Sequence, residues 1–262
     1  LVLALLIGVQ VSAQEAEWTS IKDINPFIGT GGHGHTHPSA QAPFGMIQLG
    51  PNTRYEGWDG CGGYHYTDSA MYGFSCTHLS GTGVSDYGDL LMLPYSSPTK
   101  EGDHIKFFKE DEHAQAGYYA CILDDGTRIE ATAGDRTGIL RIRFGEGSEP
   151  GIMIDLNFRD RVLKKSFEAT GIGEWQGSRI SEGWAREQHF YFGLEITARP
   201  DTAIEVSDGV YWIPMPEGTR ETTVRMGMSG TSEQGAWRNF VAELTNKNFE
   251  EVFDETQGKW AK

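Results

Sequence analysis

The sequence has few cysteines, few basic residues and no long apolar segment in its interior. Its three cysteines, Cys61, Cys76 and Cys121, are an odd number, so at least one is unpaired and no disulfide framework stabilises the fold. Lysine and arginine number 22 against 37 acidic residues, which gives a net charge of −15. This balance argues against a nucleic-acid partner and leaves no basic surface for anionic lipid. We therefore expect a neutral ligand.

The longest apolar run lies at the very start of the sequence. Leu1–Val9 is apolar throughout, and the small residues Val11–Ala13 precede Gln14, which is typical of a signal-peptide cleavage site. The run is too short to cross a bilayer. We interpret residues 1–13 as the remnant of a signal peptide and expect an exported protein without a membrane span, located in the periplasm, on the cell surface or outside the cell.

From Tyr118 onward the sequence shows the period-two pattern of β-strands. Leu140 and Ile142 alternate with arginines, as a half-buried strand requires. Asp124–Gly126 and Ser207–Gly209 each place Asp-Gly between two such runs, which predicts hairpins with type I′ turns. About ten strands follow from this spacing. It predicts one all-β domain, an antiparallel β-sandwich over residues 14–235.

The carboxyl end changes to helical spacing. Phe240 and Leu244 lie four residues apart in the first of two apolar patterns. Asn248, followed three residues later by Glu251, has the form of a capping box and predicts the start of a second helix. We expect two short helices, which form a helical linker over residues 236–262.

The region from Asp23 to Thr99 concentrates glycine, aromatic rings and histidine. It holds 14 of the 34 glycines, ten aromatic residues, five of the eight histidines and a single basic residue, Arg54. Each interior glycine costs roughly 0.5–1 kcal/mol relative to alanine, so a segment needed only for packing would not carry so many. We interpret the region as a binding site built from loops. Its richest segments are Gly29–His37, Gly57–Ser69 and Thr77–Pro94.

Three histidines alternate in the first of these segments. His33, His35 and His37 are separated by single residues, a spacing that permits chelation of a transition metal. The surrounding glycine and proline disfavour a regular strand, and no supporting carboxylate is evident. Two other interpretations stay open: the rings hydrogen-bond to the backbone of a tight loop, or they contact a sugar.

Trp58 and Asp59 form a pair that suits carbohydrate binding. An indole offers a flat face to the C–H groups of a sugar ring, and a carboxylate accepts hydrogen bonds from neighbouring hydroxyls. Trp58 is alternatively a core residue, but its flanking glycines leave it little local packing. Asp86 and Asp89 suggest a general acid and base, yet their spacing on a loop does not fix the separation that such a pair needs. We therefore expect sugar binding without catalysis here.

The chain contains four long motifs, INPFIGTGGHGHTHP, APFGMIQLGP, GWDGCGGYHY and GFSCTHLSGTGVSDYGDLLMLP. In these motifs it resembles the amino-terminal domain of glycoside hydrolase family 92, the calcium-dependent exo-acting α-mannosidases. The resemblance implies a β-sandwich of supersandwich type, packed on a larger carboxyl-terminal (α/α)6 barrel with the substrate pocket between them. It also implies inversion of configuration, with the general acid, the general base and the calcium ligands in the barrel, beyond this sequence.

The resemblance also implies which residues form the sandwich's share of the pocket. Trp58 matches the tryptophan that packs beside bound mannose. His37 departs from the family, which usually has an aromatic residue there, and this weakens the metal interpretation. No catalytic residue or metal ligand carries over to this chain. The other residues that match pocket positions are Asp59, Cys61, Tyr64, His65, His33, His35 and His78.

Together these observations predict the pocket-forming domain of an exported, inverting exo-α-mannosidase. Its partners are expected to be mannose-terminated glycans and the barrel of the same protein, which would bind the calcium. Without the barrel we expect no hydrolysis. The alternative is a stand-alone carbohydrate-binding module that uses Trp58 and Asp59 without any chemistry.

Overall fold

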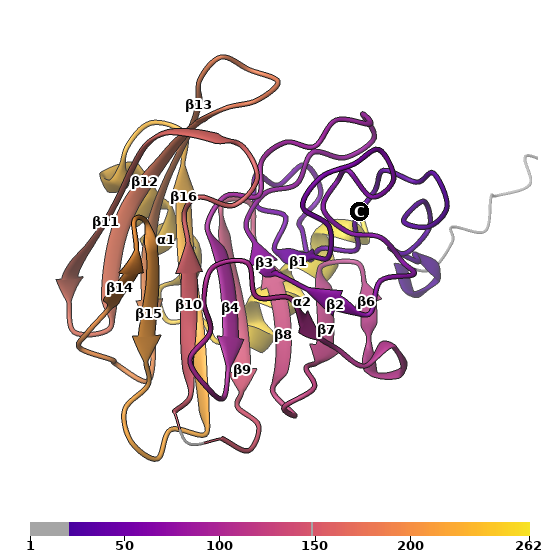
Figure 1. Cartoon of the computed structure of the whole chain (residues 1–262). Helices are drawn as coiled ribbons and strands as arrows, with labels where there is room; N and C mark the ends of the chain where they lie inside the picture. The colour runs from indigo at the N-terminus through magenta and orange to yellow at the C-terminus, as the bar shows by residue number, and fades with distance from the viewer. Residues whose placement is uncertain (1–20, 148) are drawn as a thin grey trace, which may run out of the picture.

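Two antiparallel sheets stack face to face, and two helices cover the outer side of the larger sheet (Figure 1). The computed structural model describes residues 21–147 and 149–262, so the predicted signal peptide, residues 1–13, lies outside it. In the described ranges, neither helix is long and apolar enough for a membrane crossing. The predicted all-β sandwich with short carboxyl-terminal helices is confirmed.

The smaller sheet has six strands in the order β1-β3-β4-β10-β15-β14. Its central pair, β4 and β10, joins segments about 60 residues apart in the sequence, with Met153 opposite Leu93. Every residue of β10 is buried, as expected of a strand covered on both faces. The strands are β1 (Gly50–Asn52), β3 (Gly73–Ser75), β4 (Leu91–Tyr95), β10 (Gly151–Asp155), β14 (Ile204–Ser207) and β15 (Val210–Pro214).

The larger sheet has eight strands in the order β11-β12-β13-β16-β9-β8-β7-β6. Its strands are β6 (His113–Gln115), β7 (Tyr118–Ile122), β8 (Arg128–Ala133), β9 (Thr137–Arg143), β11 (Arg161–Gly171), β12 (Glu174–Glu182), β13 (Gln188–Ile196) and β16 (Glu221–Ser229). A small sheet pairs β2 (Ala70–Met71) with β5 (Ile105–Lys106), and the 3-10 turns are η1 (Ile21–Asp23) and η2 (Lys109–Asp111).

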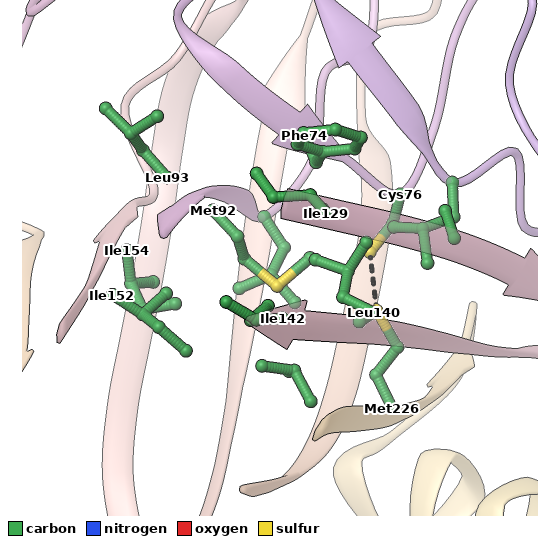
Figure 2. Close-up of a cluster of buried hydrophobic side chains, with 14 of the residues drawn as sticks. Phe74, Cys76, Met92, Leu93, Ile129, Leu140, Ile142, Ile152, Ile154 and Met226 are labelled. Carbon is green, nitrogen blue, oxygen red and sulfur yellow. Dashed lines mark hydrogen bonds between the residues drawn. The ribbon is translucent and has the colours of Figure 1, made fainter. Parts of the chain in front are cut away.

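The main core fills the space between the two large sheets. In β9, Leu140 and Ile142 are fully buried while Arg143 is exposed, so the predicted alternation is confirmed. Figure 2 shows apolar side chains of the two sheets meeting there, with the Cys76 thiol hydrogen-bonded to the sulfur of Met226 at 3.2 Å. All three cysteines are buried and free, so the core is held without disulfides.

The helices cover a second, smaller core. α1 (Glu233–Leu244) packs on β16 and β13, and α2 (Phe249–Trp260) packs on β8. The predicted capping box is present, because the Asn248 side chain accepts from the Glu251 backbone and Glu251 bonds back to the backbone of Asn248. Ile139 precedes Leu140 in β9 and therefore points to the opposite face, where it meets the apolar sides of the helices. The residues of this core are Ile139, Phe240, Leu244, Phe249 and Val252.

Two expectations about local structure were wrong. The predicted hairpins exist, but only Gly126 and Gly209 have positive φ in their turns, whereas a type I′ turn needs two such residues. The described chain also has sixteen strands, not about ten. Several of the additional strands, such as β2 and β5, are only two or three residues long, too short to give a periodic signal in the sequence.

Candidate functional site

Three glycine-rich loops fold onto one another beside the smaller sheet. We call residues 29–37 loop A, residues 55–66 loop B and residues 77–89 loop C. Loop B follows β1 and loop C follows β3, so the two strands at one edge of the sheet carry both loops (Figure 1). The three loops contain almost no regular structure, so backbone hydrogen bonds and buried side chains must hold their shape.

Backbone hydrogen bonds join loop A to the other two loops. The Gly60 amide donates to the carbonyl of Gly34 at 3.3 Å, and the Gly81 amide donates to the carbonyl of His35 at 2.7 Å. At Gly34, a Cβ atom would lie 1.9 Å from the carbonyl oxygen of Gly29, so no other residue fits there. The structure therefore brings the three segments together, and close backbone contact explains part of their glycine content.

Trp58 stands on the surface of loop B and not in the core. Its side chain is 63% exposed. The ring of His35 meets it edge-on, with the centroids 4.8 Å apart and the planes at 84°. On the loop C side, a Cβ at Gly83 would lie 2.7 Å from the indole, so glycine is needed for this close packing. The indole is thus exposed but held in place by loops A and C.

Asp59 forms an ion pair with His33 next to the indole. The Nδ1–H of His33 donates to Oδ1 of Asp59 at 2.7 Å, and both side chains are accessible to solvent. This hydrogen bond raises the pKa of His33 and lowers the pKa of Asp59. Asp59 is therefore an ionised acceptor, and within residues 21–147 and 149–262 its second oxygen makes no hydrogen bond, so the group suits sugar hydroxyls.

His65 and His78 are buried anchors for the loops. Nε2 of His65 lies 2.9 Å from the carbonyl of Gly32, and its Nδ1 faces Thr67. Nδ1 of His78 donates to the carbonyl of Gly62 at 2.8 Å. Burial lowers the pKa of His78 to about 4, so its ring is neutral at physiological pH. Both rings hydrogen-bond to carbonyl oxygens of glycines. That role was one of the interpretations of the loop A histidines, and not of His65 and His78.

The histidines of loop A point to three different partners. His33 faces Asp59, His35 faces Trp58, and His37 stacks on His78 with the ring centroids 4.6 Å apart. Burial and the neighbouring His78 lower the pKa of His37 well below its usual value. The described part of the chain contains no group of three histidine, cysteine or acidic side chains that could hold a metal. The metal interpretation of the alternating histidines therefore lacks a ligand set.

Cys61 and Tyr64 lie behind the loop B surface, fully buried. The hydroxyl of Tyr64 donates to the carboxylate of Glu112 at 2.8 Å, and Tyr119 donates to the same carboxylate at 2.7 Å. Burial together with this carboxylate raises the pKa of Tyr64. In the described chain Tyr64 thus connects loop B to Glu112, which follows η2, and through that carboxylate to Tyr119 of β7. Direct contact of Cys61 and Tyr64 with a ligand stays a prediction.

Arg159 was not found from the sequence, although it is the main support of loop B. Its guanidinium donates from Nε to the carbonyl of Tyr55 at 3.2 Å and from an Nη to the carbonyl of Cys61 at 2.8 Å. It therefore holds the two ends of the turn that carries Trp58, at Tyr55 and Cys61. Arg54, the lone basic residue noted in the sequence, binds the carbonyl of Asp59 at 3.0 Å. Burial lowers the pKa of Arg159 to about 10.

The aspartates of loop C are engaged in structural contacts. Asp89 accepts from Arg179 at 2.6 Å and from the Thr77 hydroxyl at 2.7 Å, and it is 3% exposed. Asp86 is equally buried and accepts from the Gln188 side chain at 2.9 Å. Both carboxylates are therefore occupied by hydrogen bonds that join loop C to β12 and β13.

Comparison with known proteins gives a consistent result. The chain matches the glycosyl hydrolase family 92 N-terminal domain over residues 24–248. It is similar to a solved family GH92 α-mannosidase from Bacteroides thetaiotaomicron, with 29% identity, 93% of this chain and 38% of that chain covered, and a TM-score of 0.83. That enzyme has also been solved in complex with mannoimidazole. A family GH92 inverting mannosidase from Bacteroides thetaiotaomicron VPI-5482, 21% identical over 92% of this chain and 36% of its own, shares the fold at a TM-score of 0.79.

Among curated proteins, the chain is similar to an uncharacterized secreted glycosidase of Arthroderma benhamiae. The two are 24% identical over 307 residues, which cover 98% of this chain and 40% of the relative. The chain thus spans about two fifths of the length of these relatives.

Proposed function

Because the chain belongs to glycoside hydrolase family 92 and corresponds to its N-terminal domain, we propose that it forms one wall of the substrate pocket of an inverting exo-α-mannosidase. The substrate would be the terminal mannose of a glycan. The names of its relatives support this proposal, since three of the solved structures are of two mannosidases and one of the three holds mannoimidazole. We further propose that the protein is exported, as the name of the Arthroderma glycosidase suggests for that relative.

The Trp58–Asp59 pair is the observation that carries the proposal. Its indole is 63% exposed yet held by His35 and Gly83, so it offers an apolar face in a fixed orientation. The adjacent carboxylate is kept ionised by His33 and accepts hydrogen bonds from vicinal hydroxyls. An apolar face beside an ionised acceptor matches the two kinds of surface on a pyranose.

Residues 21–147 and 149–262 offer no ligand set for calcium. On loops A to C, Glu56 is exposed and Asp59 is paired with His33, while Asp86 and Asp89 are buried and hydrogen-bonded to other side chains. No three potential ligands come together in residues 21–147 and 149–262. We propose that calcium and the catalytic acid and base belong to the remainder of the full-length protein, so we assign no catalytic step to this chain.

In this proposal the chain's own residues bind and orient the sugar. Trp58 would stack on the C–H face of the mannose, and Asp59 would fix its rotation by accepting hydroxyl hydrogens. Arg159 would act as a positioning residue, because it holds the two stems of loop B without facing solvent itself. The catalytic groups would then meet a sugar whose orientation is already set.

The full-length protein tests the proposal. We expect it to hydrolyse 4-nitrophenyl α-mannoside, and proton NMR of the first minutes should show β-mannose before mutarotation. If α-mannose forms first, the enzyme retains configuration and that part of the proposal is wrong. A full-length protein that binds mannosides without releasing 4-nitrophenol would instead favour the carbohydrate-binding module.

A further inference from the structure

Phe44 combines two unfavourable features that the fold does not require. It occupies the third position of the turn Ala42–Gly45, closed by a hydrogen bond of 3.0 Å from the Gly45 amide to the Ala42 carbonyl. Its φ is 58°, in the left-handed region that glycine normally fills at this turn position. Its side chain is also fully exposed, at 106% of the reference surface. A strained backbone that presents a bare phenyl ring indicates a functional constraint.

The surface beside Phe44 continues as a cleft that polar and apolar side chains line together. Met46, two residues further on, is 43% exposed and lines a cleft of about 580 Å³. The apolar part of its lining includes Phe190 and Met228, which are otherwise buried. An exposed aromatic ring beside a cleft is typical of a protein interface in which each partner inserts side chains into the other.

The end of α2 is fastened to the same turn. The indole of Trp260 donates to the carbonyl of Gln41 at 2.8 Å. Lys259 forms an ion pair of 2.6 Å with Asp135, whose carbonyl in turn accepts from the Met46 amide at 2.7 Å. Any polypeptide that follows α2 therefore leaves the sandwich beside Phe44. Figure 1 accordingly shows the C-terminus beside the coil that residues 21–100 form.

We propose that Phe44 is an anchor residue for the domain that follows this one in the full-length protein. The ring would insert into an apolar pocket of that domain, and the cleft beside Met46 would receive one of its side chains. The occupant is inferred from the exit of α2 at the turn and from the relatives, of which this chain spans only about two fifths. The inference shares with the proposed function only the need for a following domain, and its test does not use activity.

Replacement of Phe44 by glycine separates strain from docking. In the 262-residue chain, Phe44→Gly relieves the left-handed strain, so we expect the melting temperature to stay the same or to rise by about 1–3 °C. In the full-length protein we expect it to fall by at least about 3 °C, because the anchor is lost. Arg199→Gly is the matched control: Arg199 has a φ of 57° and is exposed, and its replacement should behave alike in both proteins.

Hydroxyl-radical footprinting supplies a second measurement on unmodified protein. We expect Phe44 to be oxidised at least about tenfold more slowly in the full-length protein than in the 262-residue chain, with Ile172, 59% exposed, as the internal reference. Equal oxidation of Phe44 in both proteins, or a Phe44→Gly effect that matches Arg199→Gly in both, would overturn the proposal. If Phe44 is protected only as concentration rises, and Phe44→Gly abolishes self-association, the occupant is a second copy and the proposal is wrong.

Discussion

Replacement of Trp58 by alanine should affect activity far more than stability. The indole is 63% exposed, so only about a third of a side chain of roughly 250 Å², or about 90 Å², is covered by the protein. At about 25 cal/mol per Å², and allowing for a compact unfolded state, the loss of stability is about 1–2 kcal/mol. For a protein of this size the melting temperature should fall by about 2–8 °C.

Trp175 provides the control for this comparison. It is 2% exposed within the core, and a core Trp→Ala change typically costs about 3–5 kcal/mol, so Trp175→Ala should lower the melting temperature by about 6–20 °C. In the full-length enzyme, Trp58→Ala should lower kcat/KM for an aryl α-mannoside by at least about 30-fold, the effect of losing a binding hot spot. A large fall in melting temperature with unchanged kinetics would assign Trp58 to packing and refute the argument.

Three further predictions concern a buried cation, a buried acid and calcium. Arg159→Met should change the free energy of unfolding by no more than about 2 kcal/mol, because the lost hydrogen bonds are offset by removal of a buried charge, whose pKa burial lowers to about 10. The kcat/KM of the full-length enzyme should nevertheless fall at least about tenfold. Unchanged kinetics would show that loop B does not need this support. Burial raises the pKa of Asp160 to about 7, so its stabilising protonated form is lost as pH rises from about 4 to 7. Asp160→Asn should therefore be more stable than the wild type at pH 8, on the order of 1–3 kcal/mol by urea denaturation, but not at pH 4; equal differences at both pH values would contradict the shift. The 262-residue chain should release no 4-nitrophenol with or without calcium and should show no calcium-dependent melting shift, whereas a chelator should inactivate the full-length enzyme; turnover by the short chain would place catalytic groups within it.

The fold class was predictable from local sequence patterns, because each pattern depends only on residues that are neighbours in the sequence. The alternation through Leu140 and Ile142 has the period of a strand with one face in the core, and both residues lie there. The pair Asn248 and Glu251 predicted the start of α2 because a capping box is complete within four residues. The turn type at Gly126 was not predictable in this way, since it depends on how the partner strands twist.

The candidate site was only partly predictable. Its loops stood out by composition, because backbones in close contact require glycine at positions such as Gly34 and Gly83. The separate directions of the His33, His35 and His37 side chains were not predictable, since spacing within a loop does not fix where side chains point. Arg159 gave no local signal, because its partner carbonyls lie about a hundred residues away in the sequence.

The sequence by itself determined that the chain forms a β-sandwich with a glycine-rich binding region, because strand period, helix caps and glycine content are properties of short segments. Only the tertiary structure decided which of the predicted residues face solvent and which support them. Trp58 is exposed and Asp59 partly exposed, while Tyr64, His65 and His78 are buried, because the loops are held by contacts with Glu112, Arg159 and other residues of distant segments. Such contacts join residues that are far apart in the sequence, so no local pattern predicts them.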